Sequence, residues 1–538
     1  MTSAVTDESG VTAPTAESTE HLDVLIVGAG LSGIGAASYI EKRCPWASYA
    51  VFEGRDAIGG TWDLFRYPGV RSDSDMFTLG YSFRPWDRQE SIAEGGSILQ
   101  YIKETAAATG VDRRIRFNHR VVWAEWSTGE ARWRITAERS PADGGPAQTV
   151  QLTCRFLFSC TGYYRYDHGY QPDFPGAERF EGTILHPQAW PEDLDYAGKR
   201  VVVIGSGATA VTLVPSMAKT AGHVTMLQRS PTYIASLPAR SPIAAFLRRW
   251  LPGRLADPAI RWFNALTSQG FYQLSRRRPA TVKRMLRKGL ERQLPAGYDI
   301  DTHFTPRYDP WDQRMCLVPD GDLFAAIREG TVSVVTDHIV SFTERGLLLR
   351  SGTELEADVV VTATGLELLF MGGIELAVDG RAVDPGKLLA YKGMMLEGVP
   401  NLALAFGYTN ASWTLKADLT CAYVCRLLNH MRATGMRQCT PVNSDATLTR
   451  QPLLSLNSGY INRSQHLFPK QGSKFPWQVH QSYLRDYRAL RASGLTDEAM
   501  VFSNPIGAGT VGPDGPGRPD PDGPERTERL EGALTAAS

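Results

Sequence analysis

Two glycine-rich turns, each placed directly after an apolar run, constrain the fold of this chain more than any other feature. The first turn follows LDVLIV at residues 22–27, and the second follows the run RVVVI that begins at Arg200. Such an apolar run predicts a strand buried on both faces of a parallel sheet. A strand, a glycine turn and a small-residue helix together open a dinucleotide-binding unit. The sequence therefore predicts an α/β fold with two doubly wound, Rossmann-like domains.

Each position of the first turn has its own predicted role. Gly28 allows the tight turn, Gly30 lets a pyrophosphate approach the backbone, and Gly33 lets the helix pack on the strand. Ser32 belongs to the same turn, where the N-terminus of the helix faces the phosphates. The next strand, YAVFE, ends in Glu53, 20 residues after Gly33, where a carboxylate accepts the hydroxyls of an adenosine ribose.

The second unit lacks that carboxylate. Its turn and the start of its helix are Gly205, Ser206, Gly207, Ala208, Thr209 and Ala210. The following strand, HVTMLQ, ends without an acid, and Arg229 and Ser230 come next. An arginine fork matches a ribose phosphate, so we expect NADPH here, although Arg229 could also be an ordinary surface cation. Two units in one chain predict electron transfer from NADPH to FAD, with Glu53 marking the first unit as the FAD site.

Composition and charge exclude several other classes of protein. The chain has 57 Lys and Arg against 57 Asp and Glu, unlike a typical nucleic-acid-binding protein. No apolar run is long enough for a transmembrane helix, and residues 1–20 resemble neither a secretory nor a mitochondrial leader. Seven scattered cysteines without a CxxC pair predict free thiols, no metal site and a reducing, cytoplasmic compartment.

The chain divides into five predicted segments. Residues 1–20 are polar and acidic, residues 504–538 are dense in Pro and Gly, and both ends are expected to be disordered. Between them we expect the first part of an FAD domain over 21–165, an NADPH domain over 166–360 and the return of the FAD domain over 361–503.

A basic segment interrupts the predicted NADPH domain. Residues 241–292 hold twelve Lys and Arg against two acids, interleaved with apolar residues, which predicts amphipathic helices inserted over about 241–300. These helices could present solvated faces that cap a substrate tunnel, or they could make peripheral contact with a membrane. Because both ends of the chain carry net negative charge and the whole chain has none, the folded part between them must carry net positive charge.

Two long motifs identify the chemistry. One contains GGTW from Gly59 and RYPGVRSD, which ends at Asp73, and the other, FxGxxxHxxxWP, runs from Phe180 to Pro191. With these motifs the chain resembles the flavin-dependent (class B) Baeyer–Villiger monooxygenases over essentially all of 21–503. Within that family, segments such as VVVIGSGATAVTLVP and YDPWDQRMCLVPDGDLF resemble the ethionamide-activating monooxygenases of mycobacteria.

This resemblance implies an enzyme that uses FAD, NADPH and O2. Such an enzyme converts apolar ketones to esters or lactones through a flavin peroxide, and it also oxygenates sulfur in thioethers or thioamides. One alternative is a flavin monooxygenase that acts mainly on sulfur or nitrogen, and another is a non-catalytic dinucleotide sensor. The physiological substrate and the oligomeric state stay open.

The resemblance also assigns the residues of the reaction. Arg314 is the fixed cation that stabilises developing negative charge, and Asp73 is its carboxylate partner. Otherwise Arg314 is a surface cation in a loop and Asp73 a helix N-cap, although Asp75 could be the cap.

Further residues are assigned to the cofactors and to the contact between domains. His186 of the second motif is expected to have a structural or an interdomain hydrogen-bonding role. Trp413 is expected near the flavin, where a helix that starts at Thr414 could stabilise negative charge. The other expected cofactor contacts are Thr61, Trp62, Asp63, Leu64, Arg71, Ser72 and Val121.

Overall fold

The computed structural model of the chain describes residues 19–141, 144–454, 456–492 and 494–505. The predicted disordered ends therefore lie outside the described residues, apart from two residues at each inner margin. Glu20 already opens the first strand, so the folded part begins one residue earlier than predicted. Within the described ranges, no helix combines the length and the apolar character needed to cross a bilayer.

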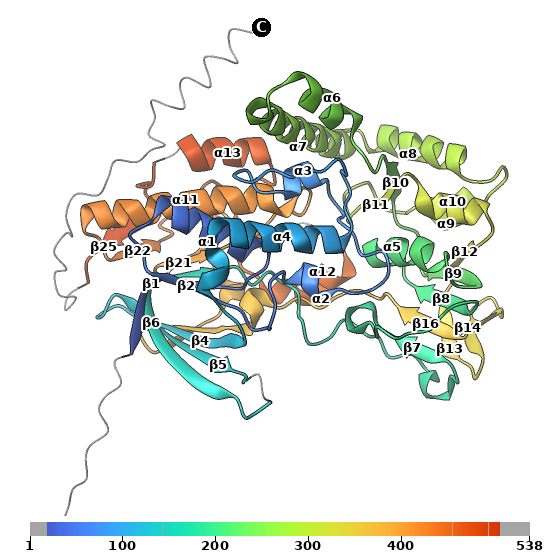
Figure 1. Ribbon diagram of the computed structural model, residues 1–538, viewed down its shortest axis with the longest axis horizontal. Helices are drawn as coiled ribbons and strands as arrows, with labels where there is room; N and C mark the ends of the chain where they lie inside the picture. Colours follow the sequence, from blue (N-terminus) through green and yellow to red (C-terminus); the bar gives the residue numbers. More distant parts are fainter. Residues whose placement is uncertain (1–18, 142–143, 455, 493, 506–538) are drawn as a thin grey trace, which may run out of the picture.

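A nine-stranded mixed sheet is built from two distant parts of the chain (Figure 1). Its order is β18-β17-β4-β5-β6-β1-β2-β3, with β21 also paired to β6. The central strands are parallel, whereas β5 runs antiparallel to both neighbours. The strands are β1 (Glu20–Val27), β2 (Tyr49–Phe52), β3 (Ile115–Arg116), β4 (His119–Ser127), β5 (Arg132–Arg139), β6 (Gln148–Ser159), β17 (Glu375–Val378), β18 (Arg381–Val383) and β21 (Leu402–Leu404).

Helices from two distant parts of the chain cover one face of this sheet. Buried side chains of α1 (Leu31–Arg43), α4 (Gly95–Thr109) and α11 (Trp413–Thr434) share one core with β1. Figure 1 shows these three helices side by side above the sheet. The first nucleotide-binding unit is therefore completed by the returning chain. All seven cysteines are buried free thiols, as expected.

The second sheet has five strands, all parallel, in the order β12-β9-β8-β16-β7. Its strands are β7 (Thr183–Leu185), β8 (Arg200–Ile204), β9 (His223–Gln228), β12 (Val332–Thr336) and β16 (Val359–Thr362). On one face pack α5 (Ala208–Met217) and α10 (Asp322–Arg328), and on the other lies a small sheet of β13 (Ile339–Phe342), β14 (Gly346–Leu349) and β15 (Glu354–Glu356). The predicted fold class is confirmed.

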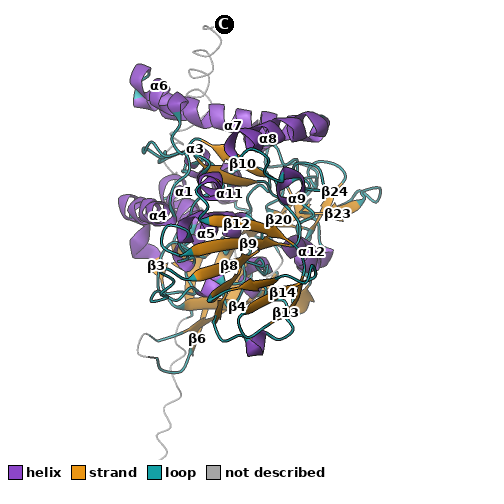
Figure 2. Ribbon diagram, turned by 90° about the vertical axis from the view of Figure 1, so that its right-hand side faces the viewer, coloured by secondary structure: helices purple, strands orange, loops and turns teal. Residues whose placement is uncertain are grey.

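Helices form an insert between β10 (Ile234–Leu237) and β11 (Cys316–Pro319). They are α6 (Pro242–Trp250), α7 (Gly253–Arg277), α8 (Pro279–Gln293) and α9 (Ile300–Phe304). Figure 2 shows α6, α7 and α8 as a layer at one edge of the molecule. Arg261 fastens α7 to the body, because it donates to the Gly80 carbonyl at 2.5 Å and pairs with Asp418 at 2.9 Å.

The chain also forms further α-helices and β-strands. They are α2 (Thr61–Leu64), α3 (Met76–Leu79), α12 (Gly459–Ser464), α13 (Tyr483–Ala492), β19 (Ala390–Tyr391), β20 (Met395–Leu396), β22 (Gln438–Pro441), β23 (Arg450–Pro452), β24 (Lys470–Gly472) and β25 (Met500–Ser503).

Candidate active site

The first glycine turn is shaped for a close approach by a ligand. Gly28 has φ +103°, and a Cβ atom on Gly33 would lie 1.7 Å from the Gly28 carbonyl oxygen, so the fold itself requires glycine at both positions. A Cβ on Gly30 would meet only ordinary contacts, the nearest at 3.5 Å from the Gly60 Cα. The packing therefore does not explain Gly30, which agrees with a glycine that leaves the backbone open to a phosphate.

Glu53 lies at the end of β2, beside this turn. The carboxylate is buried and accepts hydrogen bonds from the Ala29 N–H at 2.6 Å and the Arg55 N–H at 2.9 Å. Burial raises the pKa of Glu53, and the two backbone N–H groups oppose that rise. Each oxygen retains a further lone pair for a ribose hydroxyl.

The segment after Glu53 wraps over the glycine turn. Thr61 starts α2, Trp62 and Leu64 are half-buried, and Gly59 forms a backbone bridge with Gly30. Asp63 is buried and forms ion pairs with Arg55 at 2.7 Å and with Arg66 at 2.9 Å. Its carboxylate thus fixes the segment, and the predicted cofactor contact of Asp63 stays a prediction. Val121 is buried in β4 at a bulge.

Two helix N-termini meet at the first glycine turn. Ser32, in the first turn of α1, accepts a hydrogen bond from the Trp413 indole at 2.7 Å. Trp413 is the first residue of α11, one position before the predicted helix start. Helix N-termini favour negative charge, so both ends suit an anionic cofactor.

The second turn brings its predicted residues to one sheet edge. Gly205 has φ +137°, and a Cβ there would lie 2.4 Å from the Ala363 carbonyl oxygen. The Ser206 hydroxyl donates to the Ser230 carbonyl at 3.1 Å, which links the turn to the end of β9. Gly207 and Ala208 are exposed, and Thr209 and Ala210 lie in the first turn of α5.

The end of β9 has no carboxylate. The Gln228 side chain is buried and donates to the His303 carbonyl at 2.7 Å, so it is not free for a ribose. Arg229 is exposed, and no carboxylate of the described residues pairs with it. This arrangement leaves the guanidinium available for a phosphate at the predicted position.

The RYPGVRSD segment crosses between the two sheets. Arg71 pairs with Asp322 of α10 at 2.5 Å. The Ser72 hydroxyl accepts the Ala93 N–H at 3.1 Å. Both side chains thus have protein partners, and their predicted cofactor contacts stay predictions. Asp75 is the N-cap of α3, since its side chain accepts the Thr78 N–H, and Asp73 is left free for another partner.

That partner is Arg314. The guanidinium lies 2.9 Å from the Asp73 carboxylate and donates to the Thr409 carbonyl at 2.8 Å. Burial is the strongest single influence and disfavours the charge, but the Asp73 carboxylate and the nearby tyrosines, above all Tyr460, together raise the pKa of Arg314. The arginine is therefore a permanent cation fixed from two sides, not a loop cation in solvent.

Arg314 faces a pocket that sequence reasoning did not find. The pocket has a volume of about 310 Å³, and its other lining residues are Tyr163, Leu368, Tyr408, Thr409, Leu454, Leu456, Tyr460 and Ile461. Most of them come from distant loops, Tyr460 and Ile461 come from the short helix α12, and the set shares no spacing that would have signalled it. The lining is mostly apolar and aromatic, and Arg314 is its one charged residue.

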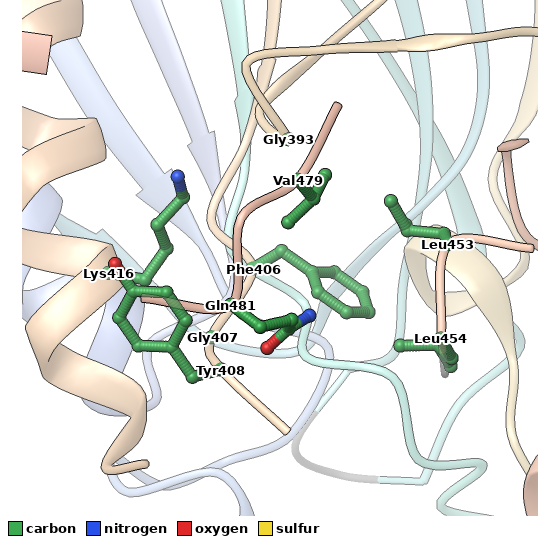
Figure 3. Close-up of a pocket in the computed structure, with 9 residues that line it drawn as sticks. All are labelled: Gly393, Phe406, Gly407, Tyr408, Lys416, Leu453, Leu454, Val479 and Gln481. Atoms are coloured by element: carbon green, nitrogen blue, oxygen red, sulfur yellow. The ribbon is translucent and has the colours of Figure 1, made fainter. Parts of the chain in front are cut away.

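A second cavity of about 300 Å³ shares Tyr408 and Leu454 with the first. Figure 3 shows Phe406 and Gln481 between Lys416 on one side and the two leucines at 453 and 454 on the other. Lys416 is buried and pairs with Asp486 at 2.9 Å, so its charge is already neutralised.

His186 lies directly after β7, at the edge of the second sheet. Its Nε2 lies 3.1 Å from the carbonyl oxygen of Gly365, in the chain returning to the first sheet. A Cβ on Gly169 would lie 2.0 Å from the imidazole Cε1, so the ring packs directly on the backbone. Burial lowers the pKa of His186. The hydrogen bond links residues that follow two paired strands of the second sheet, β7 and β16, so it fits a structural role, and an interdomain role of His186 stays a prediction.

Known proteins match the chain over most of its length. The family model described as flavin-binding monooxygenase-like matches residues 22–395. The FAD-containing monooxygenase EthA of Mycobacterium tuberculosis is 53% identical over 493 residues, or 91% of this chain and 100% of that protein. The probable FAD-binding monooxygenase AlmA of Acinetobacter baylyi is 48% identical over 486 residues, or 90% of this chain and 96% of that protein.

Solved structures share the fold. Oxidized steroid monooxygenase bound to NADP has a TM-score of 0.64 at 24% identity, covering 78% of this chain and 88% of that chain. The open structure of cyclohexanone monooxygenase has a TM-score of 0.64 at 20% identity, covering 79% of this chain and 90% of that chain. The family model extends across the two glycine turns and Arg314. The chain therefore belongs to the flavin-binding monooxygenase-like family.

Proposed function

We propose that this flavin monooxygenase uses FAD, NADPH and O2 to convert ketones to esters or lactones, and that it also oxygenates sulfur in thioethers or thioamides. The reaction balances when a ketone, O2, NADPH and a proton give an ester, NADP+ and water. The observation that carries the proposal is the Arg314–Asp73 pair at the wall of an apolar, aromatic pocket.

The residues present fit both dinucleotides. Gly30 is open where the packing does not require glycine, and Glu53 stands at the ribose position of the first unit. In the second unit, a Cβ atom added to Gly207 would meet no other atom within 4 Å, and Arg229 replaces the ribose carboxylate. EthA is named as an FAD-containing monooxygenase, and the steroid monooxygenase structure is bound to NADP, which supports the same pair of cofactors. Bound FAD, reduced by NADPH, would supply the activated oxygen.

Arg314 suits the charge that ketone oxygenation develops. When a carbonyl group is attacked, its oxygen becomes negative, and a preorganised cation stabilises it without reorganisation. Asp73 and the Thr409 carbonyl hold the guanidinium in one orientation. A sulfur atom develops no such oxyanion, so the fixed arginine favours ketones among the substrates.

The pocket wall suits an apolar ketone. Leu368, Leu456 and Ile461 offer apolar surface, while Tyr163 and Tyr460 add aromatic faces. Such a lining offers few polar groups besides Arg314 to compete for the reacting carbonyl.

The test is product analysis with the FAD-loaded enzyme. We expect NADPH and isotope-labelled O2 to convert a cyclic ketone to a lactone with one labelled oxygen, and a thioether to a sulfoxide. Sulfoxide without lactone would refute ketone oxygenation and favour the heteroatom alternative. Hydrogen peroxide as the only oxygen product, with either substrate, would refute both activities.

A further inference from the structure

The insert helices α6–α8 expose an apolar face. Thirteen large apolar side chains of the described residues are exposed, and eight of them lie in these three helices. This concentration shows that the exposure is a property of the insert and not of the whole surface. The eight residues are Ile243, Phe246, Trp250, Leu255, Phe263, Leu266, Leu274 and Met285.

Their spacing places them on one side of each long helix. On α6, Ile243, Phe246 and Trp250 follow each other at three and four residues, which is one face of a helix. Phe246 is 62% and Trp250 is 69% exposed, and their rings lie 6.4 Å apart. On α7 the spacings between successive exposed apolar residues are eight, three and eight residues. At 3.6 residues per turn, these spacings also keep them on one side of the helix: Leu255, Phe263, Leu266 and Leu274.

The basic residues of the insert fall into two groups. Five of the twelve form ion pairs with carboxylates: Arg248, Arg261, Arg276, Lys283 and Arg287. The other seven are exposed and pair with no carboxylate of the described residues: Arg249, Arg254, Arg277, Arg278, Arg284, Lys288 and Arg292. The exposed face of the insert is therefore both apolar and cationic.

We propose that this face of α6–α8 docks on an anionic lipid bilayer. Phe246 and Trp250 would enter the headgroup region, and the unpaired cations would contact acidic headgroups. A nucleic acid would use the cations but not the apolar stripe, and a second copy of the chain would bring like charges together. Figure 2 shows the three helices as an outer layer, beyond the second sheet, where a bilayer can reach them.

Docking there would bring lipid close to the candidate site. Arg276 at the end of α7 pairs with Asp312 at 2.6 Å, and Lys283 of α8 pairs with Asp309 at 2.7 Å. Both aspartates belong to the loop that carries Arg314. An apolar substrate dissolved in the bilayer would thus reach the protein next to its pocket, although the docking itself does not depend on the reaction.

Vesicle cosedimentation of the full-length holoenzyme tests the proposal. We expect binding to phosphatidylcholine vesicles that contain phosphatidylglycerol, little binding to phosphatidylcholine alone, and weaker binding at high salt. The pair Phe246→Ser/Trp250→Ser and the pair Arg277→Glu/Arg278→Glu should each weaken binding about tenfold or more.

A matched control lies in the β13–β14 hairpin, far from α6 in Figure 1. Val340 is 49% exposed and Arg350 is exposed, so Val340→Ser/Arg350→Glu removes the same kinds of group elsewhere and should bind like the parent. Retained flavin absorbance and unchanged NADPH oxidation in solution show that each variant is folded.

Two results would overturn the proposal. One is a parent enzyme that does not cosediment with anionic vesicles, and the other is an insert variant that binds them as tightly as the parent. Light scattering tests the competing explanation, that this face joins copies of the chain. That explanation holds if the parent does not bind vesicles and Phe246→Ser/Trp250→Ser converts an oligomer into a monomer.

Discussion

Replacing Arg314 with alanine separates a role in the reaction from a role in folding. The Asp73 side chain is 52% exposed, so water solvates its carboxylate once the arginine is gone, and the ion pair contributes only about 0–1 kcal/mol. The lost hydrogen bond to the Thr409 carbonyl adds about 1 kcal/mol. We therefore expect the free energy of unfolding to fall by roughly 1–2 kcal/mol.

The same change should affect ketone oxygenation much more. One preorganised group that stabilises a developing oxyanion is worth about 2.7–4 kcal/mol, or about 10²–10³ in kcat. We expect ester formation to fall by that factor, while NADPH is still consumed and hydrogen peroxide is released. Arg314→Lys keeps the charge but not the fork, so it cannot hold Asp73 and the Thr409 carbonyl together and should recover only part of the rate.

The assay measures ester, NADPH and hydrogen peroxide in the same reaction, and flavin fluorescence follows thermal unfolding. Arg287→Ala is the matched control, because Arg287 also forms an ion pair but its partner Asp301 lies at the surface. Ester formation at the parent rate in Arg314→Ala would refute the proposed role. A large fall in unfolding temperature would show instead that Arg314 holds the fold.

Two further predictions concern charged side chains outside the pocket. Arg229→Ala should raise the KM for NADPH about tenfold to a hundredfold, the worth of a hydrogen bond to a charged group, and leave the KM for NADH nearly unchanged; equal shifts in steady-state kinetics would refute a phosphate contact. Arg261→Met should lower the free energy of unfolding by about 3–5 kcal/mol at neutral pH, because it leaves the buried Asp418 carboxylate without its ion-pair partner. Burial raises the pKa of Asp418 and Arg261 opposes that rise, so without the arginine the pKa rises further and the deficit shrinks as the pH falls and the carboxylate binds a proton. Denaturant unfolding at neutral and acidic pH measures this loss of stability. Adding Asp418→Asn to Arg261→Met should restore stability. A loss that is the same at both pH values would contradict the role of the Asp418 carboxylate.

The sequence predicted the features that depend on neighbouring residues. Gly28 and Gly33 are five residues apart and contact each other, so the turn could be recognised without knowing the rest of the fold. The start of α11 differed from its predicted position by a single residue. The choice between Asp73 and Asp75 as the N-cap stayed open, because both precede α3 at similar spacing, and the structure resolves it in favour of Asp75.

The partners of charged residues could not be predicted in the same way. Arg71 and Asp322 are 251 residues apart, and no pattern in either segment points to the other. Asp63 has the position of a cofactor contact in the motif, yet its carboxylate holds two arginines. The pocket residues Tyr163 and Tyr460 were missed for a related reason, because neither a loop nor the six-residue helix α12 shows a periodicity that marks one side as inward.

Arg314 lies in a loop without regular structure, so its precision must come from the surrounding contacts. Asp312, two residues earlier, is held by Arg276 of the insert and also accepts the Asn457 N–H on its carbonyl at 2.8 Å. Trp311 adopts φ +72°, which an L-residue rarely does without support. The insert and the returning chain thus both hold the loop. It follows that a substitution of Arg276 in α7 can change the reaction without touching a cofactor.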